Sequence, residues 1–165
     1  MATDEEAYKT FSDLFGPIIK DLHPKFDFRY SYKFEEIQLA TFEQRLSEMK
    51  HIMQKAENLQ IKLRRNFRGM PFSPLMTKEA KLQIERKVVE VLGELYGQYH
   101  QVARIEEKEK GWLKSIGVPV KRTSLHDAAG INDDYPVGRG VFIEDQHNFV
   151  VLVNFEDHIE IILLP

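Results

Sequence analysis

The chain of 165 residues contains no cysteine, so it can form neither a disulfide framework nor a thiolate metal site. Its apolar runs are far shorter than the roughly 20 residues of a membrane-spanning helix. The start of the chain, MATDEEAYK, lacks the apolar core of a secretory signal. The excess of charge is also small, and a net charge of −3 gives no electrostatic reason to bind nucleic acid or an anionic membrane. We therefore expect a cytoplasmic protein without nucleic-acid or membrane partners.

Motifs for several kinds of catalysis are absent as well. Residues 138–140, Gly-Arg-Gly, lack the length and the lysine of a glycine-rich phosphate loop. Ser115 and Ser124 do not stand in the pattern of a nucleophile elbow. The six histidines show no paired spacing of metal ligands, and without cysteine a structural zinc site is not expected. The residues alone therefore predict no metal site.

The composition that is present, with 42% hydrophobic and 30% charged residues, is typical of one soluble globular unit. Apolar residues recur at helical spacing between residues 5 and 22, which predicts a helix with one buried face. Gly16-Pro17 is expected to divide this helix, since proline disrupts a helix interior. We expect residues 1–34 to form a docking helix with an irregular link, and residues 35–165 to form the main body of the fold.

Residues 35–58 are the most regular helix candidate. Their apolar side chains alternate at spacings of three and four, as in a heptad seam: Leu39, Phe42, Leu46, Met49 and Met53. Two interpretations are open. The helix packs on its own domain, or it pairs with a helix of a partner or of a second copy. Only about two and a half heptads are present, which is short for a coiled coil.

Further along the chain, residues 59–68 alternate well enough for a strand, which the proline-rich residues 71–74 end. Thr77 is a suitable N-cap for the next helix, whose apolar face we expect to continue as far as Tyr99. The single tryptophan, Trp112, stands in a segment bounded by glycines. We expect it to anchor the core, and contact with a partner is the alternative.

The last part of the chain carries three apolar segments separated by polar turns: residues 141–143, 149–153 and 159–164. Loops of four or five residues between such segments are typical of hairpins, so we predict a β-meander. Together with the helices, this pattern predicts an α+β fold in which helices pack on a partial antiparallel sheet.

The last of these segments is nearly all apolar. Unless the fold places it centrally, it presents an unpaired hydrophobic edge, which natural proteins protect. The cover could be a second copy, another protein or the helix predicted at 35–58. We therefore regard Ile159, Ile161 and Leu163 as candidate contact residues, together with the seam of that helix.

Several stretches resemble the phosphagen kinases, the ATP:guanidino phosphotransferases that include arginine, creatine and taurocyamine kinases. The most specific is Asn154-x-Glu156-Asp157-His158 followed by Ile161-Ile162. Pro136-x-Gly138-Arg139-Gly140, residues 65–74 (RNFRGMPFSP) and residues 8–23 (YKTFSDLFGPIIKDLH) support it. The match covers most of the chain except residues 25–60. It implies that residues 35–165 resemble the first half of the phosphagen kinase catalytic domain.

The resemblance also implies a site. Glu156 falls at the catalytic carboxylate that orients the guanidinium of the substrate; without the family, Glu156-Asp157-His158 reads as an ordinary polar turn. An ungapped alignment places the phosphate-binding arginines at Gln60, Lys62 and Glu160, and the adenine-contacting histidine at Ile143. These three residues together carry no net charge, whereas three arginines would carry +3. One unit charge about 4 Å away contributes roughly 4 kcal/mol at an effective dielectric constant near 20, so the loss of these arginines removes much of the attraction for the phosphates. We therefore expect no bound MgATP or MgADP.

In the family a further portion follows the stretch at which this sequence stops, and it carries a reactive cysteine, more arginines and a second glutamate. These observations favour a truncated and catalytically inactive relative in which Glu156 is vestigial. We expect it to act as a structural or partner-binding subunit, as a homodimer or with another protein; the resemblance suggests a cytoskeletal or axonemal one. The alternative is an active or partner-completed ATP:guanidino phosphotransferase, which would use MgATP or MgADP.

Overall fold

The computed structural model describes residues 2–27, 60–118 and 122–164. The chain divides into two compact units, one of residues 1–7 with 60–164 and the other of residues 8–59 with residue 165. The predicted helix at 35–58, with its candidates Leu39, Phe42, Leu46, Met49 and Met53, lies outside the described residues.

Two short helices begin the chain, α1 (Glu5–Thr10) and α2 (Ser12–Leu22). Asp4 caps the first, since its Oδ1 accepts a hydrogen bond of 2.8 Å from the Ala7 N–H. The break falls at Phe11, whose carbonyl accepts from the N–H groups of Leu14 and Phe15 and so begins α2. The predicted division at Gly16-Pro17 is therefore wrong, and Pro17 lies inside α2.

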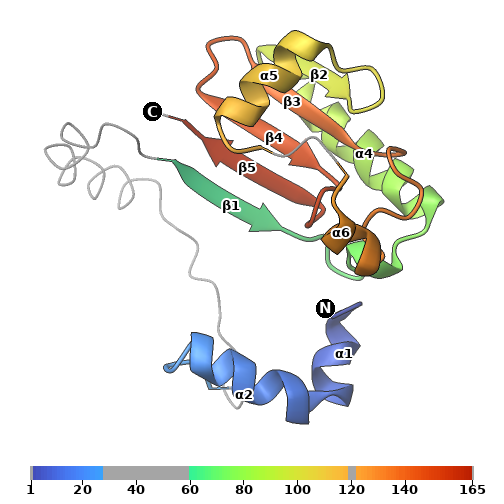
Figure 1. The fold of residues 1–165 in the computed structure, drawn as a ribbon, viewed down its shortest axis with the longest axis vertical. Helices are drawn as coiled ribbons and strands as arrows, with labels where there is room; N and C mark the ends of the chain where they lie inside the picture. Colours follow the sequence, from blue (N-terminus) through green and yellow to red (C-terminus); the bar gives the residue numbers. More distant parts are fainter. Residues whose placement is uncertain (1, 28–59, 119–121, 165) are drawn as a thin grey trace, which may run out of the picture. The chain divides into compact units, whose positions relative to one another are not determined.

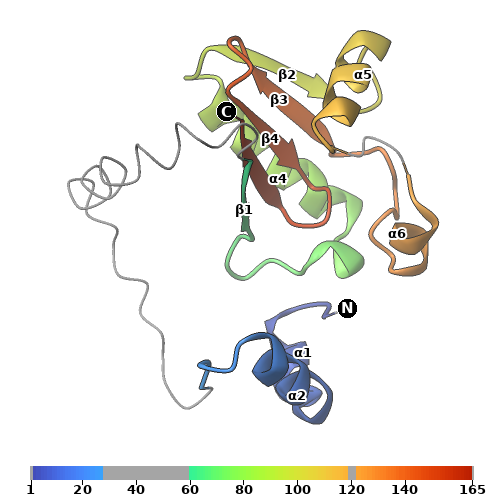
Figure 2. The ribbon, with the colours of Figure 1, turned by 60° about the vertical axis from the view of Figure 1, so that its left-hand side comes forward.

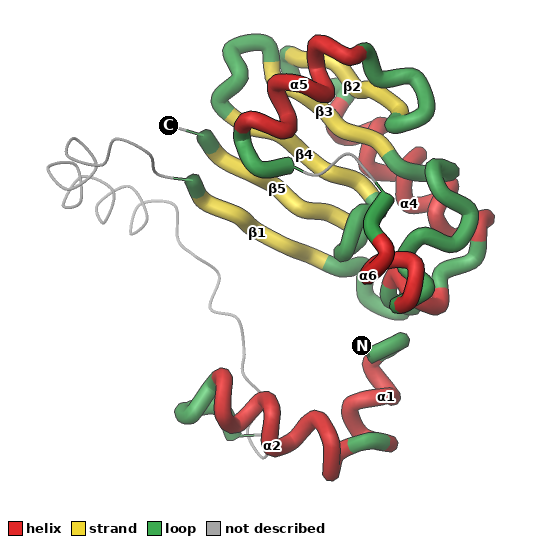
Figure 3. Tube along the Cα trace, viewed as in Figure 1, coloured by secondary structure: helices red, strands yellow, loops and turns green. Residues whose placement is uncertain are grey.

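A five-stranded antiparallel sheet forms the centre of the larger unit (Figures 1 and 3). Its strands, in spatial order, are β1 (Ile61–Arg65), β5 (Ile159–Leu163), β4 (Phe149–Val153), β3 (Gly140–Glu144) and β2 (Gly97–Gln101). The predicted meander is confirmed as β3, β4 and β5, and the strand expected within residues 59–68 is β1. The α+β fold class is confirmed as well.

Each face of the sheet is covered by one longer helix, α4 (Lys78–Leu92) or α5 (Glu107–Ser115) (Figures 1 and 2). Side chains alternate between the two faces of a strand, so each face has its own core cluster. The α4 cluster includes Ile84, Val88, Leu92, Phe142 and Val151. The α5 cluster includes Leu113, Val141, Ile143, Val150, Leu152 and Ile162, with Trp112 packed against it.

The helix that the sequence predicts as far as Tyr99 ends at Leu92. Its N-cap is confirmed, since Thr77 Oγ1 accepts a hydrogen bond of 3.2 Å from the Ala80 N–H. The chain then turns and forms β2, which begins at Gly97 with φ +156°. A Cβ there would lie 2.5 Å from the Ile143 carbonyl oxygen, so the first position of β2 requires glycine.

The last strand is not an edge strand. β5 lies between β1 and β4 and forms antiparallel ladders with both. The fold therefore places this strand centrally, so the unpaired edge that was expected for a peripheral strand does not arise, because β1 from an earlier part of the chain pairs with it. The side chains of Ile159, Ile161 and Leu163 face the same side as the α4 cluster, and Leu163 is exposed.

Two shorter elements complete the larger unit: the 3-10 helix η1 (Ser73–Leu75) and α6 (Ser124–Ala128). Within the described ranges, none of the helices combines the length and apolarity that crossing a membrane would require.

Candidate functional site

The turn that joins β4 to β5, residues 154–158, is built on Asn154. This residue adopts φ +56°, in the left-handed region that asparagine tolerates better than most residues. Its Nδ2 donates to the carbonyls of Lys81 at 2.9 Å and Gly138 at 2.7 Å. The Asn154 N–H donates to the His158 carbonyl at 3.0 Å and closes the turn. The turn is therefore fixed to α4 and to the loop before β3.

His158 fixes the other end of the turn. It is fully buried, and its Nδ1 accepts a hydrogen bond of 2.9 Å from the Phe67 N–H. Its Nε2 therefore carries the proton and donates to the Pro71 carbonyl, also at 2.9 Å. Burial lowers the pKa of His158 below the ordinary 6.5, although the Pro71 hydrogen bond and Asp157 act in the opposite direction. His158 is thus a neutral link between the turn and the segment after β1.

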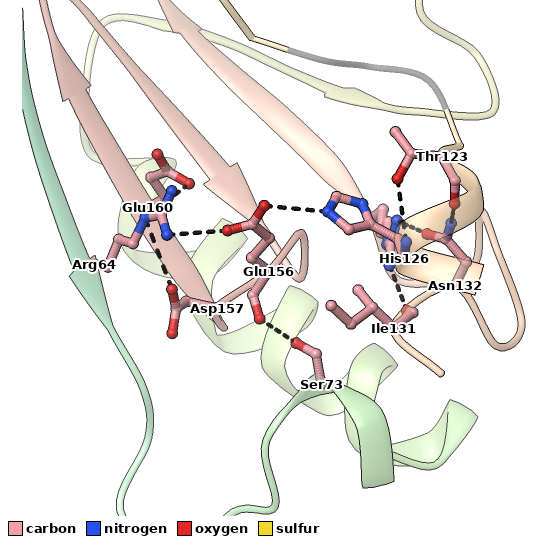
Figure 4. Close-up of polar contacts among 10 residues, drawn as sticks. Arg64, Ser73, Thr123, His126, Ile131, Asn132, Glu156, Asp157 and Glu160 are labelled. Carbon is pink, nitrogen blue, oxygen red and sulfur yellow. Dashed lines mark hydrogen bonds and ion pairs between the residues drawn. The ribbon is translucent and has the colours of Figure 1, made fainter. Parts of the chain in front are cut away.

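Between these two anchors, Glu156 points out of the turn (Figure 4). Its carbonyl accepts a hydrogen bond of 2.7 Å from Ser73 Oγ, while its side chain remains 41% exposed. Both carboxylate oxygens have partners within the chain. Arg64 Nη1 lies 3.0 Å from Oε2, and His126 Nε2 lies 3.1 Å from Oε1. The two sides of the carboxylate are therefore occupied by a guanidinium and an imidazole.

Arg64 serves more than one carboxylate. Its Nε lies 3.5 Å from Glu160 Oε2 and 3.9 Å from Asp157 Oδ2. The register places Arg64 directly across from Glu160 in the ladder of β1 and β5. Three carboxylates against one guanidinium leave this group with a formal charge of −2. The surroundings of Glu156 therefore favour cations over anions.

His126 reaches Glu156 from α6. Thr123 caps this short helix, its Oγ1 accepting from the His126 N–H at 3.2 Å. Asp127 accepts a hydrogen bond of 2.9 Å from Asn132 Nδ2, and Arg122 Nε lies 2.6 Å from it. The hydrogen bond from Asn132 and then that from Arg122 lower the pKa of the Asp127 carboxyl. A network of side chains thus holds the helix that presents His126.

The sequence positions assigned to nucleotide binding lie on one face of the sheet. Lys62 pairs with Ile162 of the α5 cluster, and Gln60 and Arg64 have the same parity along the chain. Ile143 belongs to that cluster and is buried, so its side chain serves the core. Gln60 donates to the Ile116 carbonyl at 3.0 Å, and Lys62 is exposed. Of the four positions, the structure brings only Glu160 to Glu156, through Arg64.

Sequence reasoning missed Arg64 and His126 as the partners of Glu156. Arg64 is 92 positions away and His126 is 30 positions away. The sequence did contain one signal for Arg64. It stands two residues after Lys62 on the same strand, so the two side chains lie on the same face of the sheet. The pairing itself requires the β1–β5 register, which no local pattern supplies. Among the residues described, no three histidine or acidic side chains converge in a way that could hold a metal ion.

The sequence model of the ATP:guanido phosphotransferase C-terminal catalytic domain matches residues 48–165. An arginine kinase of Anthopleura japonica is 31% identical over 166 residues, covering 98% of this chain and 23% of its own. An arginine kinase of Stichopus japonicus is 30% identical, covering 98% and 44%. A taurocyamine kinase of Schistosoma mansoni is 30% identical, covering 96% and 22%.

Solved structures agree with these matches. The substrate-free duplicated taurocyamine kinase of Schistosoma mansoni superposes with a TM-score of 0.76 at 27% identity, covering 99% of this chain and 24% of that one. Lombricine kinase shares the fold with a TM-score of 0.74 at 21% identity, covering 99% and 46%. The chain thus spans between about a fifth and a half of the length of these relatives.

Proposed function

The chain belongs to the ATP:guanido phosphotransferase family, and from this premise we propose that it is a catalytically inactive member that acts as a structural or partner-binding protein. Phosphagen kinase activity requires a carboxylate free to orient a guanidino group and cations to stabilise the transferred phosphoryl group. The contacts of Glu156 and the charges around it support the absence of both.

The observation that carries the proposal is that both carboxylate oxygens of Glu156 already have partners within the chain. Its Oε2 already binds a guanidinium, that of Arg64, at 3.0 Å. Its other oxygen binds His126. A guanidino substrate would have to displace both, because a bidentate guanidinium needs both carboxylate oxygens. In this chain Glu156 therefore acts as an internal ion-pair partner and not as a catalytic group.

The charges support the same conclusion for the nucleotide. Lys62 is the one cation among the four positions at which the resemblance implies nucleotide contacts. Glu160 is paired with Arg64, so it is not an unopposed anion, yet the group around Arg64 remains at −2. A nucleotide polyphosphate is repelled by such a group. We therefore propose that the chain binds no MgATP or MgADP.

The partner-binding role is supported by apolar side chains on the α4 face of β1 and β5. Ile61 and Leu63 are each 41% exposed, and Leu163 is 37% exposed. These residues adjoin Ile159 and Ile161, which the sequence pattern singled out. A protein partner or a second copy would bury them. A cytoskeletal or axonemal partner is a proposal by analogy with the family, and purification of the native protein with its partners tests it.

Titration calorimetry of the purified chain with MgADP, together with an assay of phosphoryl transfer to arginine and taurocyamine, tests the inactivity. We expect no binding up to millimolar nucleotide and no turnover, with the arginine kinase of Stichopus japonicus as the positive control. Micromolar nucleotide binding by this chain would overturn the proposal.

The second candidate is an active or partner-completed ATP:guanidino phosphotransferase. The exposure of Glu156 and the anchored turn that carries it favour this candidate. The same assay separates the two functions. Turnover by the chain alone identifies an active enzyme, and turnover that appears only with a co-purified protein identifies a partner-completed one.

A further inference from the structure

One edge strand of the sheet is exposed along its whole length. β1 is outermost, with β5 on its inner side and no described residue paired with its outer side (Figures 1 and 3). All five residues of β1 are exposed, whereas β2 at the opposite edge has only two exposed residues. The outer side of β1 is therefore a surface to which another strand can add.

The ladders show which backbone groups of β1 face outward. Successive residues of an antiparallel strand bond alternately to the two sides. The Asn154 N–H bonds to the His158 carbonyl and continues the ladder of β4 and β5, so β5 bonds β4 through its even-numbered residues. It therefore bonds β1 through odd-numbered residues of both strands. The N–H and C=O groups of Lys62 and Arg64 point outward, and the Arg64 carbonyl accepts only from the Arg65 side chain, at 2.7 Å.

Two copies of β1 fit each other in one antiparallel register. When Lys62 is paired with Arg64 of the second copy, both outward residues of each strand form hydrogen bonds. Leu63 then faces Leu63 of the second copy on the two-fold axis. A register centred on Lys62 or on Arg64 would instead place two identical cations opposite each other. The register centred on Leu63 is therefore the favoured one.

The charges in this register are complementary. Arg64 with Glu156, Asp157 and Glu160 forms a group with a formal charge of −2. Lys62 is exposed and lies on the same face of the sheet as Arg64. In the paired sheet, Lys62 of each copy lies beside this group of the other copy and reduces its charge to −1. Both groups gain a cation, because a two-fold axis repeats every contact.

We propose that a second copy of this chain pairs with β1, so that two five-stranded sheets form one continuous sheet in a two-fold dimer. On the α4 face, Leu63 packs on Leu63 of the second copy, and Ile61 packs on the aliphatic part of Arg65. Both Ile61 and Leu63 are 41% exposed in the single chain. This inference rests on the partner-binding role proposed above and names the partner.

Sedimentation equilibrium of the full chain measures the association. Two strands of five residues make a small interface, so we expect a monomer–dimer equilibrium with a micromolar Kd. Lys62→Glu is expected to raise this Kd at least about tenfold, because attraction becomes repulsion at both ends of the pairing. Lys108→Glu makes the same change of charge beside Gln98 of β2, at the opposite edge, and should leave the Kd within twofold. A monomer at every micromolar concentration, or equal effects of the two variants, would overturn the proposal.

Single cysteine variants test the register, because the chain contains no cysteine of its own. Facing residues of a non-hydrogen-bonded antiparallel pair have Cα atoms about 4.5 Å apart, within the range of a disulfide. Leu63→Cys is therefore expected to form an intermolecular disulfide under mild oxidation. Ile61→Cys is the matched control on the same face, and its counterpart in the second copy is about 13 Å away. We expect it to cross-link at least about tenfold more slowly, and equal rates would contradict the pairing.

The failures of the two proposals are distinguishable. A chain that stays monomeric alone but co-purifies with another protein overturns the second copy as the partner and retains the partner-binding role. A monomer without any co-purified protein overturns both. Neither measurement of the dimer uses an assay of turnover, so an active chain would overturn the proposed inactivity alone.

Discussion

Arg64 and Glu160 face each other across the ladder of β1 and β5, with 3.5 Å between Nε and Oε2. Only 7% of the Glu160 side chain is exposed, so its carboxylate depends on Arg64 for compensation. The resemblance implies an arginine at position 160 in other members of the family. In this chain the guanidinium comes instead from the neighbouring strand, and it also binds Glu156. This chain therefore has a carboxylate at position 160 of β5, and the guanidinium of Arg64 on β1 reaches the turn that carries Glu156.

Replacing Arg64 with alanine is expected to destabilise the fold by about 1–2 kcal/mol, since Glu160 is then left nearly buried and unpaired. The loss is limited because half of the Arg64 side chain is exposed, so solvent screens its charge. Urea unfolding at neutral pH measures it. Arg68→Ala, which removes an exposed arginine just beyond the same strand, is the control and should change stability by less than about 0.5 kcal/mol. Equal effects of the two substitutions would mean that the Glu160 contact contributes nothing.

Exchanging the two charges should recover part of this loss. Arg64→Glu alone places four carboxylates together, and Glu160→Arg alone places two guanidinium groups side by side. The double variant restores an opposite pair at the same register position. A double-mutant cycle measured by urea unfolding is expected to give a favourable coupling of about 1 kcal/mol or more. Simple additivity of the two single variants would contradict a direct interaction.

The buried His158 makes stability depend on pH. Its pKa is lowered in the folded protein, so below the ordinary value of 6.5 the unfolded chain takes up the proton more readily. The contribution of neutral His158 is therefore fully present above about pH 6.5 and declines as the pH falls from there toward the folded pKa.

Urea unfolding at several values between neutral and mildly acidic pH should show this decline for the wild type. His158→Asn, which is less stable throughout because the Phe67 and Pro71 bonds are weakened, should show a smaller dependence over the same interval. Titration of the His158 ring followed by NMR gives the second measurement. A ring that protonates at or above its ordinary pKa would refute the assignment.

Two glycines give a matched pair of substitutions with opposite expected signs. Gly138 has φ +69°, and a Cβ there would lie 2.7 Å from the Lys81 Cβ and 2.9 Å from its carbonyl carbon. Gly138→Ala is therefore expected to cost about 2–4 kcal/mol, by backbone strain and by displacing α4. Gly111 lies inside α5, where a Cβ meets nothing within 4 Å, and Gly111→Ala should stabilise by about 0.5–1 kcal/mol. Thermal unfolding compares the two variants. A tolerated Gly138→Ala would argue against the close approach of Gly138 to Lys81, the two residues whose carbonyls accept from Asn154.

The sequence predicted those parts of the fold that local chemistry determines. The β-branched runs identified β3, β4 and β5, and the hydroxyl of Thr77 marked the start of α4. β2 was missed because its sequence, GQYHQ, contains no β-branched residue and follows an apolar helical pattern. It becomes a strand through its pairing with β3, which is a tertiary effect.

The candidate site divides in the same way. Glu156 and its turn were found through the Asn154–His158 motif, and the family itself is confirmed by the match over residues 48–165. The partners of Glu156 were not found, since Arg64 and His126 reach it from other parts of the chain. The central position of β5 was also not predictable from a strand that comes last in sequence. Both misses concern contacts between distant segments, which periodicity does not encode.

The placement of β1 beside β5 has a consequence for biosynthesis. β1 is synthesised before β5, the strand that completes its ladder, which follows about 100 residues later, so β1 must wait for its neighbour. During that interval Ile61 and Leu63 have no neighbouring strand and Arg64 has no carboxylate beside it. We therefore expect chaperones to bind this segment of a nascent chain that is arrested before β5. They should dissociate once β5 has been synthesised and has paired with β1.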